Sequence, residues 1–280
     1  MHKETRLLFD CGSTKCAILT FENNNVKDHI TVSGFNPILH NNIEEAFYSN
    51  FIASKDLLPA KIDEIKFCGA GCVNHEINKQ VEQGIKKVYN VKEVLVDTDL
   101  AFIPLALNIT QPCIIAILGT GSNAGRWNGK HMDEAVFSGG YLLGDEGSAF
   151  ALGKRLLTNY IRKNFQQTAQ SFLKDQIGLE GAELIQELYK SDQPNKNIAS
   201  FAKFYGLIED PILDNCRKAC FTEFIDERIK PIMKGGDLIH LFGSVAYFNL
   251  PYLKPLLEEL NLKLDIVAKE PLGYILGRSI

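Results

Sequence analysis

The sequence predicts an α/β protein made of two related halves. Apolar strands alternate with helices along most of the 280 residues, a pattern that favours parallel strand pairing. Each half also begins with the same series of a strand, a glycine turn, a second strand and a hairpin, which indicates an internal duplication. No low-complexity linker separates the halves, so we expect a helix at 100–108 to join two domains that hinge against each other.

The first copy of the repeat spans Arg6–Lys15. The apolar run Leu7–Phe9 ends in Asp10, and Gly12-Ser13-Thr14-Lys15 follows after one residue. Such a turn presents backbone N–H groups and hydroxyls to an anion, and an aspartate beside it can hold a hydrated Mg²⁺. A plain bend after a buried strand also favours Gly and Ser. This copy alone therefore leaves both interpretations open.

The second copy begins with the apolar strand Cys113–Leu118, and Gly119-Thr120-Gly121-Ser122-Asn123 follows it. Aligning the two copies places Gly121-Ser122 on Gly12-Ser13. Each copy continues into a hairpin, which bends at Asn23-Asn24-Asn25 in the first half and at Asn128-Gly129 in the second. Two such glycine turns facing each other would form a clamp for a polyphosphate.

The rest of the first half alternates helix and strand. Apolar residues at helical spacing and flanking turn formers predict these elements. They are a helix at 43–53, a strand at 65–68, a helix at about 74–89, a strand at 91–96 and a helix at 100–108.

The second half has more helix. A glycine-flanked loop at 139–144 precedes a long helix that we expect to run from Asp145 to about Phe165. The remaining predicted elements are two or three helices within 172–204 separated by a polar loop at 191–197, a helix at 214–229, a strand at 238–242, a helix from near Val245 and a short helix from Pro271.

Composition excludes some classes of function. The net charge of -4 argues against a nucleic-acid-binding surface, which usually shows a basic face. Residues 1–6 lack the apolar core of a signal peptide and no apolar stretch is long enough to cross a bilayer. We therefore expect a cytoplasmic protein without a membrane or nucleic-acid partner.

The seven cysteines include two pairs spaced by four residues, Cys68/Cys72 and Cys216/Cys220. Zinc sites usually use tighter cysteine pairs together with histidine partners. The six histidines are scattered without metal-binding spacing. We expect the cysteines to be buried free thiols.

The two glycine turns, taken together with Gly144-Asp145-Glu146-Gly147-Ser148, resemble the motifs of a known family. The turns look like the phosphate-binding hairpins of the actin, heat-shock 70 and sugar-kinase superfamily, and the later motif is similar to the N-acetylglucosamine kinase and BadF/BadG-type ATPase family within it. The resemblance runs from Asp10 to about Gly273. It implies two duplicated ribonuclease H-like (actin-like ATPase) domains, 1–108 and a larger 109–280 with a helical insertion, and a cleft between them for ATP and Mg²⁺.

Asp99 is the candidate catalytic base. It follows a strand at its carboxyl end, where open α/β sheets place their ligands, and phosphoryl transfer needs a carboxylate that accepts the hydroxyl proton. A helix N-cap would use the same residue type. The resemblance favours catalysis, because Thr98-Asp99-Leu100-Ala101 matches the context of the family's catalytic aspartate. Asp97 is the second choice.

The resemblance also implies ligand contacts. Asp145 and Glu146, at the predicted helix start, would accept hydrogen bonds from sugar hydroxyls, although acids there also suit the helix dipole. Animal N-acetylglucosamine kinases have a tryptophan in the loop before these acids, whereas this chain has Ser138-Gly139-Gly140-Tyr141. The implied substrate contacts are Asn36, Asp99, Ser122, Asn123, Gly140, Asp145 and Glu146.

For the nucleotide, Gly243-Ser244 resembles the superfamily's adenosine motif, with Ser244 in place of the second glycine. An ordinary strand-to-helix turn would have the same composition. The implied nucleotide contacts are Gly12, Ser13, Thr14, Lys15, Gly119, Thr120, Gly121, Ser122, Gly243 and Ser244, with Asp10 holding Mg²⁺ through water.

The resemblance implies an ATP-dependent kinase that phosphorylates the primary hydroxyl of N-acetylglucosamine or a related amino sugar, as a possible homodimer. One alternative is a BadF/BadG-type ATPase that couples hydrolysis to a redox partner and holds an iron–sulfur cluster with one of the cysteine pairs. Another is a sugar sensor without catalysis. The sequence does not identify the sugar.

Overall fold

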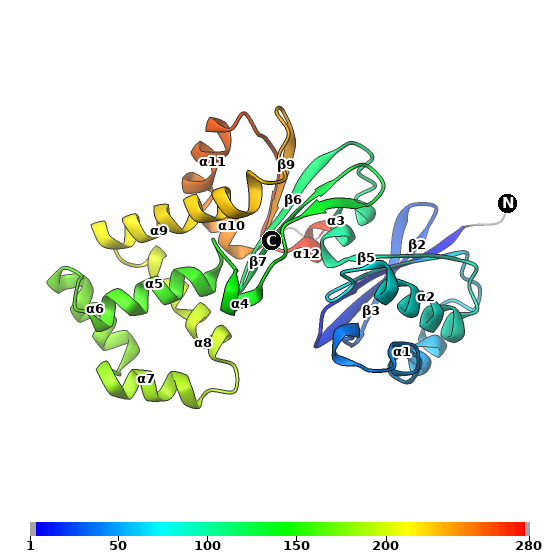
Figure 1. Ribbon diagram of the computed structural model, residues 1–280, viewed down its shortest axis with the longest axis horizontal. Helices are drawn as coiled ribbons and strands as arrows, with labels where there is room; N and C mark the ends of the chain where they lie inside the picture. The colour runs from blue at the N-terminus through cyan, green and yellow to red at the C-terminus, as the bar shows by residue number, and fades with distance from the viewer. Residues whose placement is uncertain (1–3, 278–280) are drawn as a thin grey trace. The chain divides into compact units, whose positions relative to one another are not determined.

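The computed structural model describes residues 4–277, and the chain divides into two compact units (Figure 1). The first unit comprises the chain up to Gln111 together with Trp127–Met132. The second comprises Pro112–Arg126 and the chain from Asp133 onward. Each unit contains a five-stranded sheet, so the α/β class predicted from the sequence is confirmed.

The sheet of the first unit has the order β3-β2-β1-β4-β5. Strands β1, β2 and β3 form antiparallel pairs, whereas β1, β4 and β5 are parallel. The β2–β3 hairpin turns at Asn23-Asn24, and both residues have positive φ (49° and 67°), as the two-residue turns of hairpins require. The strands are β1 (Thr5–Cys11), β2 (Lys15–Glu22), β3 (Asn25–Ser33), β4 (Glu64–Gly69) and β5 (Glu93–Thr98).

Helices α1 and α2 cover one face of this sheet (Figure 1). The core between them is rich in Phe: the rings of Phe47 and Phe51 on α1 lie 4.4 Å apart, and Phe9 on β1 lies 5.6 Å from Phe67 on β4. Burying each such side chain stabilises the fold by about 1.5–3 kcal/mol. The helical segments of this unit are η1 (Pro37–Leu39), α1 (Ile43–Phe51), η2 (Ile52–Leu57), α2 (His75–Tyr89), η3 (Asp99–Ala101) and α3 (Phe102–Ala106).

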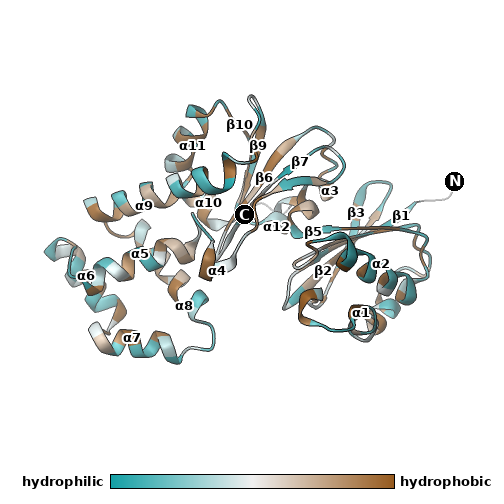
Figure 2. Ribbon diagram, in the orientation of Figure 1, coloured by the Kyte–Doolittle hydropathy of each residue, from teal (hydrophilic) through white to brown (hydrophobic). Residues whose placement is uncertain are grey.

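The bounds of α2 follow from its caps. Asn74 accepts a hydrogen bond from the Ile77 N–H at the start, and Asn90 ends the helix in the left-handed conformation (φ 51°). The outward side of α2 is mainly hydrophilic (Figure 2). The two other helices predicted in this half are less regular. The one at 43–53 becomes α1 followed by the 3₁₀ segment η2, and the one at 100–108 becomes η3 and α3.

The sheet of the second unit has the order β10-β9-β6-β7-β8. If β6–β10 are matched in chain order to β1–β5, both sheets show the same strand order. The parallel pairs β6–β9 and β9–β10 correspond to β1–β4 and β4–β5. The strands are β6 (Cys113–Leu118), β7 (Ser122–Trp127), β8 (Met132–Ala135), β9 (Leu238–Phe242) and β10 (Lys263–Ala268). Strand β10 is an addition to the sequence-based prediction.

Helices α6 and α7 lie at the end of the second unit farthest from its sheet, and α8 returns beside α5 (Figure 1). Helix α5 connects them to the sheet, since its residues Leu152, Leu156 and Tyr160 are buried in the core of the unit. The helical segments are α4 (Gly140–Leu143), α5 (Ala149–Ile161), α6 (Gln167–Ile177), α7 (Gly181–Lys190), α8 (Pro194–Ser200), η4 (Phe201–Gly206), α9 (Pro211–Phe224), the π-helical η5 (Ile225–Ile229), α10 (Ser244–Phe248), α11 (Leu250–Glu259) and α12 (Pro271–Ile275).

The predicted helix start at Asp145 is wrong. Helix α5 begins at Ala149, and Ser148 is its N-cap because the Ser148 hydroxyl accepts a hydrogen bond from the Ala151 N–H. Asp145 lies four residues earlier in a turn with φ 60°. Three smaller differences are the short helix α4 in an expected loop, the start of α8 at Pro194 inside the expected polar loop, and a four-residue turn from Asn128 to His131 in place of a two-residue turn.

Within residues 4–277, no helix is both long enough and apolar enough to span a membrane. Six of the seven cysteines are buried and Cys216 is half-buried, and all are free thiols. This agrees with the expectation of buried free thiols for all but Cys216.

Candidate active site

The first glycine turn lies between β1 and β2 and exposes its polar groups. The Gly12 N–H donates to the Lys15 carbonyl (3.0 Å), which closes the turn, while Ser13, Thr14 and Lys15 are exposed. Among residues 4–277, no group accepts a hydrogen bond from the backbone N–H of Ser13 or Thr14. Two unpaired N–H groups beside two hydroxyls are suited to bind an anion.

Asn36 lies against this turn. Its Nδ2 donates to the Ser13 Oγ (3.1 Å), and its Oδ1 accepts from the Ile38 N–H (3.3 Å) as the N-cap of η1. The structure therefore brings the predicted substrate residue Asn36 next to the predicted phosphate-binding residue Ser13.

Asp10 and Asp99 lie near each other at the carboxyl ends of β1 and β5. Burial and, to a smaller extent, the negative charge of Asp99 raise the pKa of Asp10 to about 6, although Lys15 acts to lower it. Burial also raises the pKa of Asp99. Within the described chain, no group donates a hydrogen bond to the Asp10 carboxylate, so both its oxygens are available to a ligand.

Asp99 has one occupied oxygen: its Oδ1 accepts from the Leu100 N–H (3.0 Å) at the start of η3. Asp99 is the first residue of η3 and Thr98 occupies the N-cap position without a side-chain hydrogen bond, so this contact is not a helix cap. No described residue donates to Oδ2 through a side chain, so that atom can accept a proton from a substrate.

Asp97 differs from both. It is buried on β5, and its Oδ1 accepts from the Thr98 N–H (2.7 Å) while its Oδ2 accepts from the Met132 N–H (3.3 Å). Both oxygens therefore accept hydrogen bonds from the backbone, and Asp97 links β5 to Met132, the first residue of β8. This is a structural role.

The second glycine turn lies between β6 and β7 and is held by α5. The Gly119 and Thr120 carbonyls accept hydrogen bonds from the N–H groups of Ala149 (2.8 Å) and Phe150 (3.1 Å). No acceptor within residues 4–277 binds the N–H of Thr120 or Gly121. The turn therefore repeats the feature of the first one, namely a pair of available N–H groups.

Asp145 contacts this turn directly. Its Oδ1 accepts from the Ser122 N–H (3.1 Å), and a Cβ atom on Gly121 would meet the two carboxylate oxygens at 2.8 and 2.9 Å. The Ser122 hydroxyl donates to the Glu146 carbonyl (2.5 Å). Burial raises the pKa of Asp145, whereas the Ser122 N–H and the charge of Arg228 lower it.

The carboxylate of Glu146, unlike that of Asp10, already has a side-chain partner within the protein. Its Oε2 accepts from the Nε of Arg228 (2.7 Å), a buried residue of η5. Of the two acids predicted to contact the sugar, only Asp145 lies at the glycine turn, and Glu146 forms an ion pair.

Two further predicted substrate residues, Asn123 and Gly140, lie on β7 and at the start of α4. Asn123 on β7 uses its Oδ1 to accept from the Ala124 N–H (3.0 Å), and Gly140 begins α4 with φ 57°. Neither contacts Asp145 through a hydrogen bond within the described residues.

Gly243 and Ser244 lie where β9 passes into α10. A Cβ on Gly243 would overlap the Leu118 carbonyl at the end of β6, so only glycine permits this approach. A cavity of about 520 Å³ opens beside the pair, with Ser244, Val245 and Phe248 of α10 among its lining residues. Its other sides come from α5, α8, η4 and α9, and its size suits a nucleoside.

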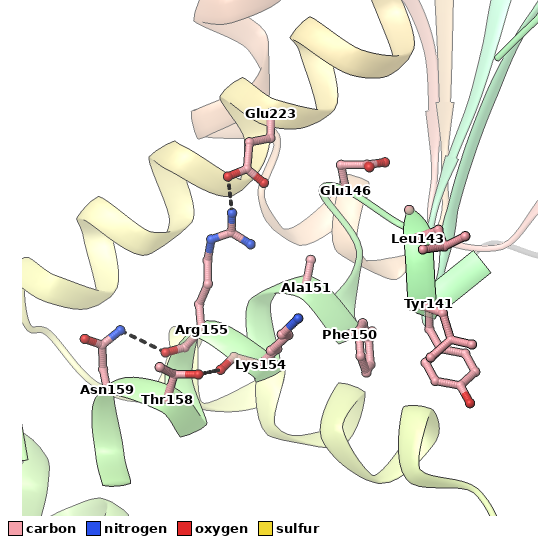
Figure 3. Close-up of a pocket in the computed structure, with 12 residues that line it drawn as sticks. Tyr141, Leu143, Glu146, Phe150, Ala151, Lys154, Arg155, Thr158, Asn159 and Glu223 are labelled. Carbon is pink, nitrogen blue, oxygen red and sulfur yellow. Dashed lines mark hydrogen bonds and ion pairs between the residues drawn. The ribbon is translucent and has the colours of Figure 1, made fainter. Parts of the chain in front are cut away.

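A second cavity of about 590 Å³ lies along α5 (Figure 3). Lys154 and Arg155 line one side, and Tyr141 with Phe150 lines another; the two rings meet edge to face at 5.5 Å. Arg155 is paired with Glu223 of α9 (Figure 3). None of the predicted nucleotide-binding residues borders this cavity, and Glu146 is the one predicted substrate residue among its lining residues.

Mg²⁺ requires oxygen ligands and retains much of its water shell, so one or two carboxylates suffice. The carboxylate of Asp10 fits this requirement, because no described group donates a hydrogen bond to it, and burial together with the charge of Asp99 raises its pKa to about 6. Among residues 4–277, no group of three or more His, Cys, Asp or Glu side chains could hold a metal ion by itself.

Arg228 is the residue that the sequence-based prediction missed. The segment 221–232 places Phe221, Ile225 and Ile232 on one apolar helix face, and Arg228 falls on the same face. An arginine within an apolar face indicates a buried partner, and this signal could have identified it.

Comparison with known proteins supports the fold over the whole chain. No model of a known protein family matches the sequence, and no curated protein matches it. Several solved structures, in contrast, match the chain. A "putative N-acetylglucosamine kinase" from Porphyromonas gingivalis is 25% identical, with 96% of each chain covered and a TM-score of 0.78. A second protein of that description, from Chromobacterium violaceum, is 16% identical with 99% of each chain covered and a TM-score of 0.67.

A third structure is a ROK-family transcriptional regulator, a homolog of the E. coli MLC protein. It is 13% identical, with 95% of this chain and 73% of that chain covered and a TM-score of 0.52. This likeness concerns the fold alone. The resemblance to N-acetylglucosamine kinases, which the motifs indicate, is confirmed by the Porphyromonas gingivalis structure, which matches the chain almost from end to end.

Proposed function

We propose that this protein is an ATP-dependent kinase that phosphorylates the primary hydroxyl of N-acetylglucosamine or a related amino sugar. The observation that carries the proposal is the grouping of Asp10 and Asp99 beside a glycine turn whose N–H groups lack acceptors among the described residues. The full-length likeness to the Porphyromonas gingivalis protein supports the amino-sugar class.

The glycine turn of each unit, Gly12–Lys15 and Gly119–Ser122, would bind phosphate groups of ATP through backbone N–H groups and hydroxyls. The cavity beside Gly243-Ser244 would hold the adenosine. The duplicated ribonuclease H-like fold of the superfamily agrees with the common strand order of the two sheets.

In the reaction, the sugar hydroxyl oxygen attacks the γ-phosphorus, the bond from that phosphorus to the β–γ bridging oxygen breaks, and ADP leaves. The hydroxyl proton passes to the Asp99 Oδ2. Burial raises the pKa of Asp99 and makes it a better proton acceptor than an exposed aspartate, because base strength increases with pKa. Asp145, held at Ser122 N–H, would accept a hydrogen bond from another sugar hydroxyl.

Asp10 would hold Mg²⁺ through water. When bound, Mg²⁺ neutralises charge on the phosphate oxygens. In addition, its positive charge would lower the pKa of Asp10, which burial and the charge of Asp99 raise in its absence.

One specific observation favours a second candidate, a sugar sensor without catalysis: the fold is shared with a transcriptional regulator. A sensor would need no carboxylate with a free oxygen at the phosphate site, so Asp10 and Asp99 favour the kinase. The redox-coupled ATPase gains no support, because Cys68, Cys72 and Cys220 are buried free thiols. The cytoplasmic location and the homodimer stay predictions.

An ADP-release assay over a sugar panel tests the proposal. The panel contains N-acetylglucosamine, N-acetylmannosamine, N-acetylmuramic acid, glucosamine and glucose, each with Mg²⁺·ATP. We expect an amino sugar to give the highest kcat/KM and a phosphorylated product. ADP formed at the same rate without sugar would contradict the proposal, and binding of sugar without ADP would favour the sensor.

A further inference from the structure

Arg228 is a buried arginine with three hydrogen-bond acceptors from a single loop. Its side chain is 3% exposed, and it lies in the π-helical segment η5 at the end of α9. Its Nε donates to the Glu146 Oε2 (2.7 Å), its Nη1 to the Phe137 carbonyl (2.7 Å) and its Nη2 to the Ser138 carbonyl (2.5 Å). The guanidinium group therefore connects both ends of the loop 137–146.

The loop is folded closely around this group. A Cβ on Gly144 would overlap both the Ser138 carbonyl and the Arg228 Nη2, so the backbone at 144 lies against the guanidinium. The planar guanidinium has donors in a fixed fork, which lysine does not have. The loop conformation therefore depends on arginine at this position.

The loop also carries Asp145, whose position is defined by its neighbours. Asp145 accepts from the Ser122 N–H (3.1 Å), and the next residue, Glu146, accepts from the Ser122 hydroxyl through its carbonyl (2.5 Å) and from Arg228 through its carboxylate. Asp145 has φ 60°, which non-glycine residues adopt only when their surroundings hold them. A continuous set of hydrogen bonds thus runs from Arg228 through Glu146 to Ser122 and Asp145.

The π-helical turn explains how Arg228 reaches the loop. In η5 the backbone hydrogen bonds join residues five apart in place of four, as between the Lys230 N–H and the Ile225 carbonyl. Such π-helical segments are frequent at functional sites. Ile225 and Ile229 on the same segment stay in the core.

We propose that Arg228 is a positioning residue that holds Asp145 for a sugar hydroxyl, with Glu146 as its partner in the ion pair and not as a sugar ligand. This inference rests on the proposed function, because it assigns Arg228 to the sugar site of that enzyme. It separates the two neighbouring acids into one that contacts substrate and one that fixes the loop.

Arg228→Lys tests the inference, because it keeps the charge and loses the fork. We expect KM for the sugar to rise about tenfold or more, KM for ATP to change less than about twofold and kcat to fall less than KM rises. Hydrogen–deuterium exchange of the amides at 138–146 should become faster. Glu146→Gln serves as the second variant if Arg228→Lys does not fold, and it should raise KM for the sugar in the same direction.

The matched control is Arg126→Lys. Arg126 is also buried in the second unit and forms an ion pair with Asp237, but it does not contact the loop 137–146. We expect Arg126→Lys to lower the unfolding temperature without raising KM for the sugar. An unchanged sugar KM in both Arg228→Lys and Glu146→Gln, or an equal rise in Arg126→Lys, would overturn the inference while leaving the kinase intact. A wild-type protein that phosphorylates no sugar would instead overturn the proposed function.

Discussion

At the scale of single residues, three aspartates in the first unit differ in how many of their oxygens are occupied. Both oxygens of Asp97 accept backbone hydrogen bonds, Asp99 uses one in this way, and Asp10 uses none among the described residues. A base and a ligand to Mg²⁺ both need a free oxygen. This difference separates candidates that the sequence, with Asp97 and Asp99 only two residues apart, could not separate.

Asp99→Asn should lower kcat by about 10²–10⁴-fold, which is the usual contribution of a general base. ATP affinity should hardly change, and sugar affinity should weaken only modestly, because the amide oxygen can keep the Leu100 N–H while the amide NH2 group donates to the sugar hydroxyl oxygen. Steady-state kinetics and calorimetric ATP titration measure these effects.

The control for Asp99 is Asp97→Asn. An amide has only one oxygen for the two N–H donors, so this variant should lose about 1–3 kcal/mol of unfolding free energy and keep kcat in the folded protein. Near-normal turnover in Asp99→Asn together with an inactive but folded Asp97→Asn would show that the two assignments are reversed.

Asp10→Asn should stabilise the ligand-free protein above pH 6. Because the pKa of Asp10 is raised from 3.8 to about 6 on folding, the folded state binds more protons than the unfolded state between these values. The stability of the wild type therefore falls as pH rises through this window, whereas asparagine has no proton to lose.

Thermal unfolding measures this effect. The variant should melt near the wild type at pH 4 and above it at pH 8, in the absence of nucleotide and Mg²⁺. Asp28→Asn, at an exposed position on β3, is the control. A lower melting temperature for Asp10→Asn at pH 8 would show that the carboxylate stabilises the fold.

At the scale of elements, the sequence predicts the helices and strands whose bounds are determined by residues within or next to them. The bounds of β9, 238–242, agree with the structure because the strand is one uninterrupted apolar run, and α2 agrees because Asn74 and Asn90 cap it. Strand β10 was missed because it is an edge strand with partly exposed residues and a weak apolar pattern. The start of α5 was misplaced because Asp145 and Glu146 accept hydrogen bonds from Ser122 and Arg228, which are distant in the sequence, and not from the first turn of the helix.

The same distinction applies to the candidate site. Both glycine turns could be predicted, because each is encoded by four or five consecutive residues. The partners of Arg228 could not, since Phe137 and Ser138 are 91 and 90 residues away in sequence. Such contacts depend on the fold of the whole unit.

Gly121→Val should abolish ATP binding. A Cβ on Gly121 would meet the Asp145 carboxylate at 2.8–2.9 Å, and the branched side chain would also occupy the space beside the turn's N–H groups. We expect Asp145 to lose its hydrogen bond to the Ser122 N–H, so sugar affinity should fall as well. Calorimetric titration of each ligand measures both effects.

Gly119→Ala is the structural control for that turn. No atom lies within 4 Å of a Cβ placed there, so the turn should keep its conformation and the variant its unfolding temperature. A folded Gly121→Val protein with normal ATP affinity would exclude this turn from the nucleotide site.

At the scale of the whole molecule, the alternatives make different demands on cysteine chemistry. A redox-coupled ATPase needs an iron–sulfur cluster held by thiolates, whereas burial raises the pKa of Cys72 to about 12 and that of Cys220 to about 11, which favours the protonated thiol. We therefore expect purified protein to contain no stoichiometric iron or zinc. The double variant Cys216→Ala/Cys220→Ala should keep its kinase activity. One iron or zinc per chain by elemental analysis would favour the redox-coupled alternative.

The kinase and the sensor differ in the fate of the bound sugar. Both predict that sugar stabilises the fold, since a ligand at 100 times its Kd adds about 2.7 kcal/mol to the free energy of unfolding, which raises the melting temperature by several degrees. Only the kinase predicts that the sugars ranked by this stabilisation are also phosphorylated, with Mg²⁺·ATP, to a product found by mass spectrometry. Asp99→Asn should keep the sugar-induced stabilisation and lose the product, because the base is absent but the contact at Asp145 remains. Stabilisation by a sugar that the wild type never phosphorylates would support the sensor.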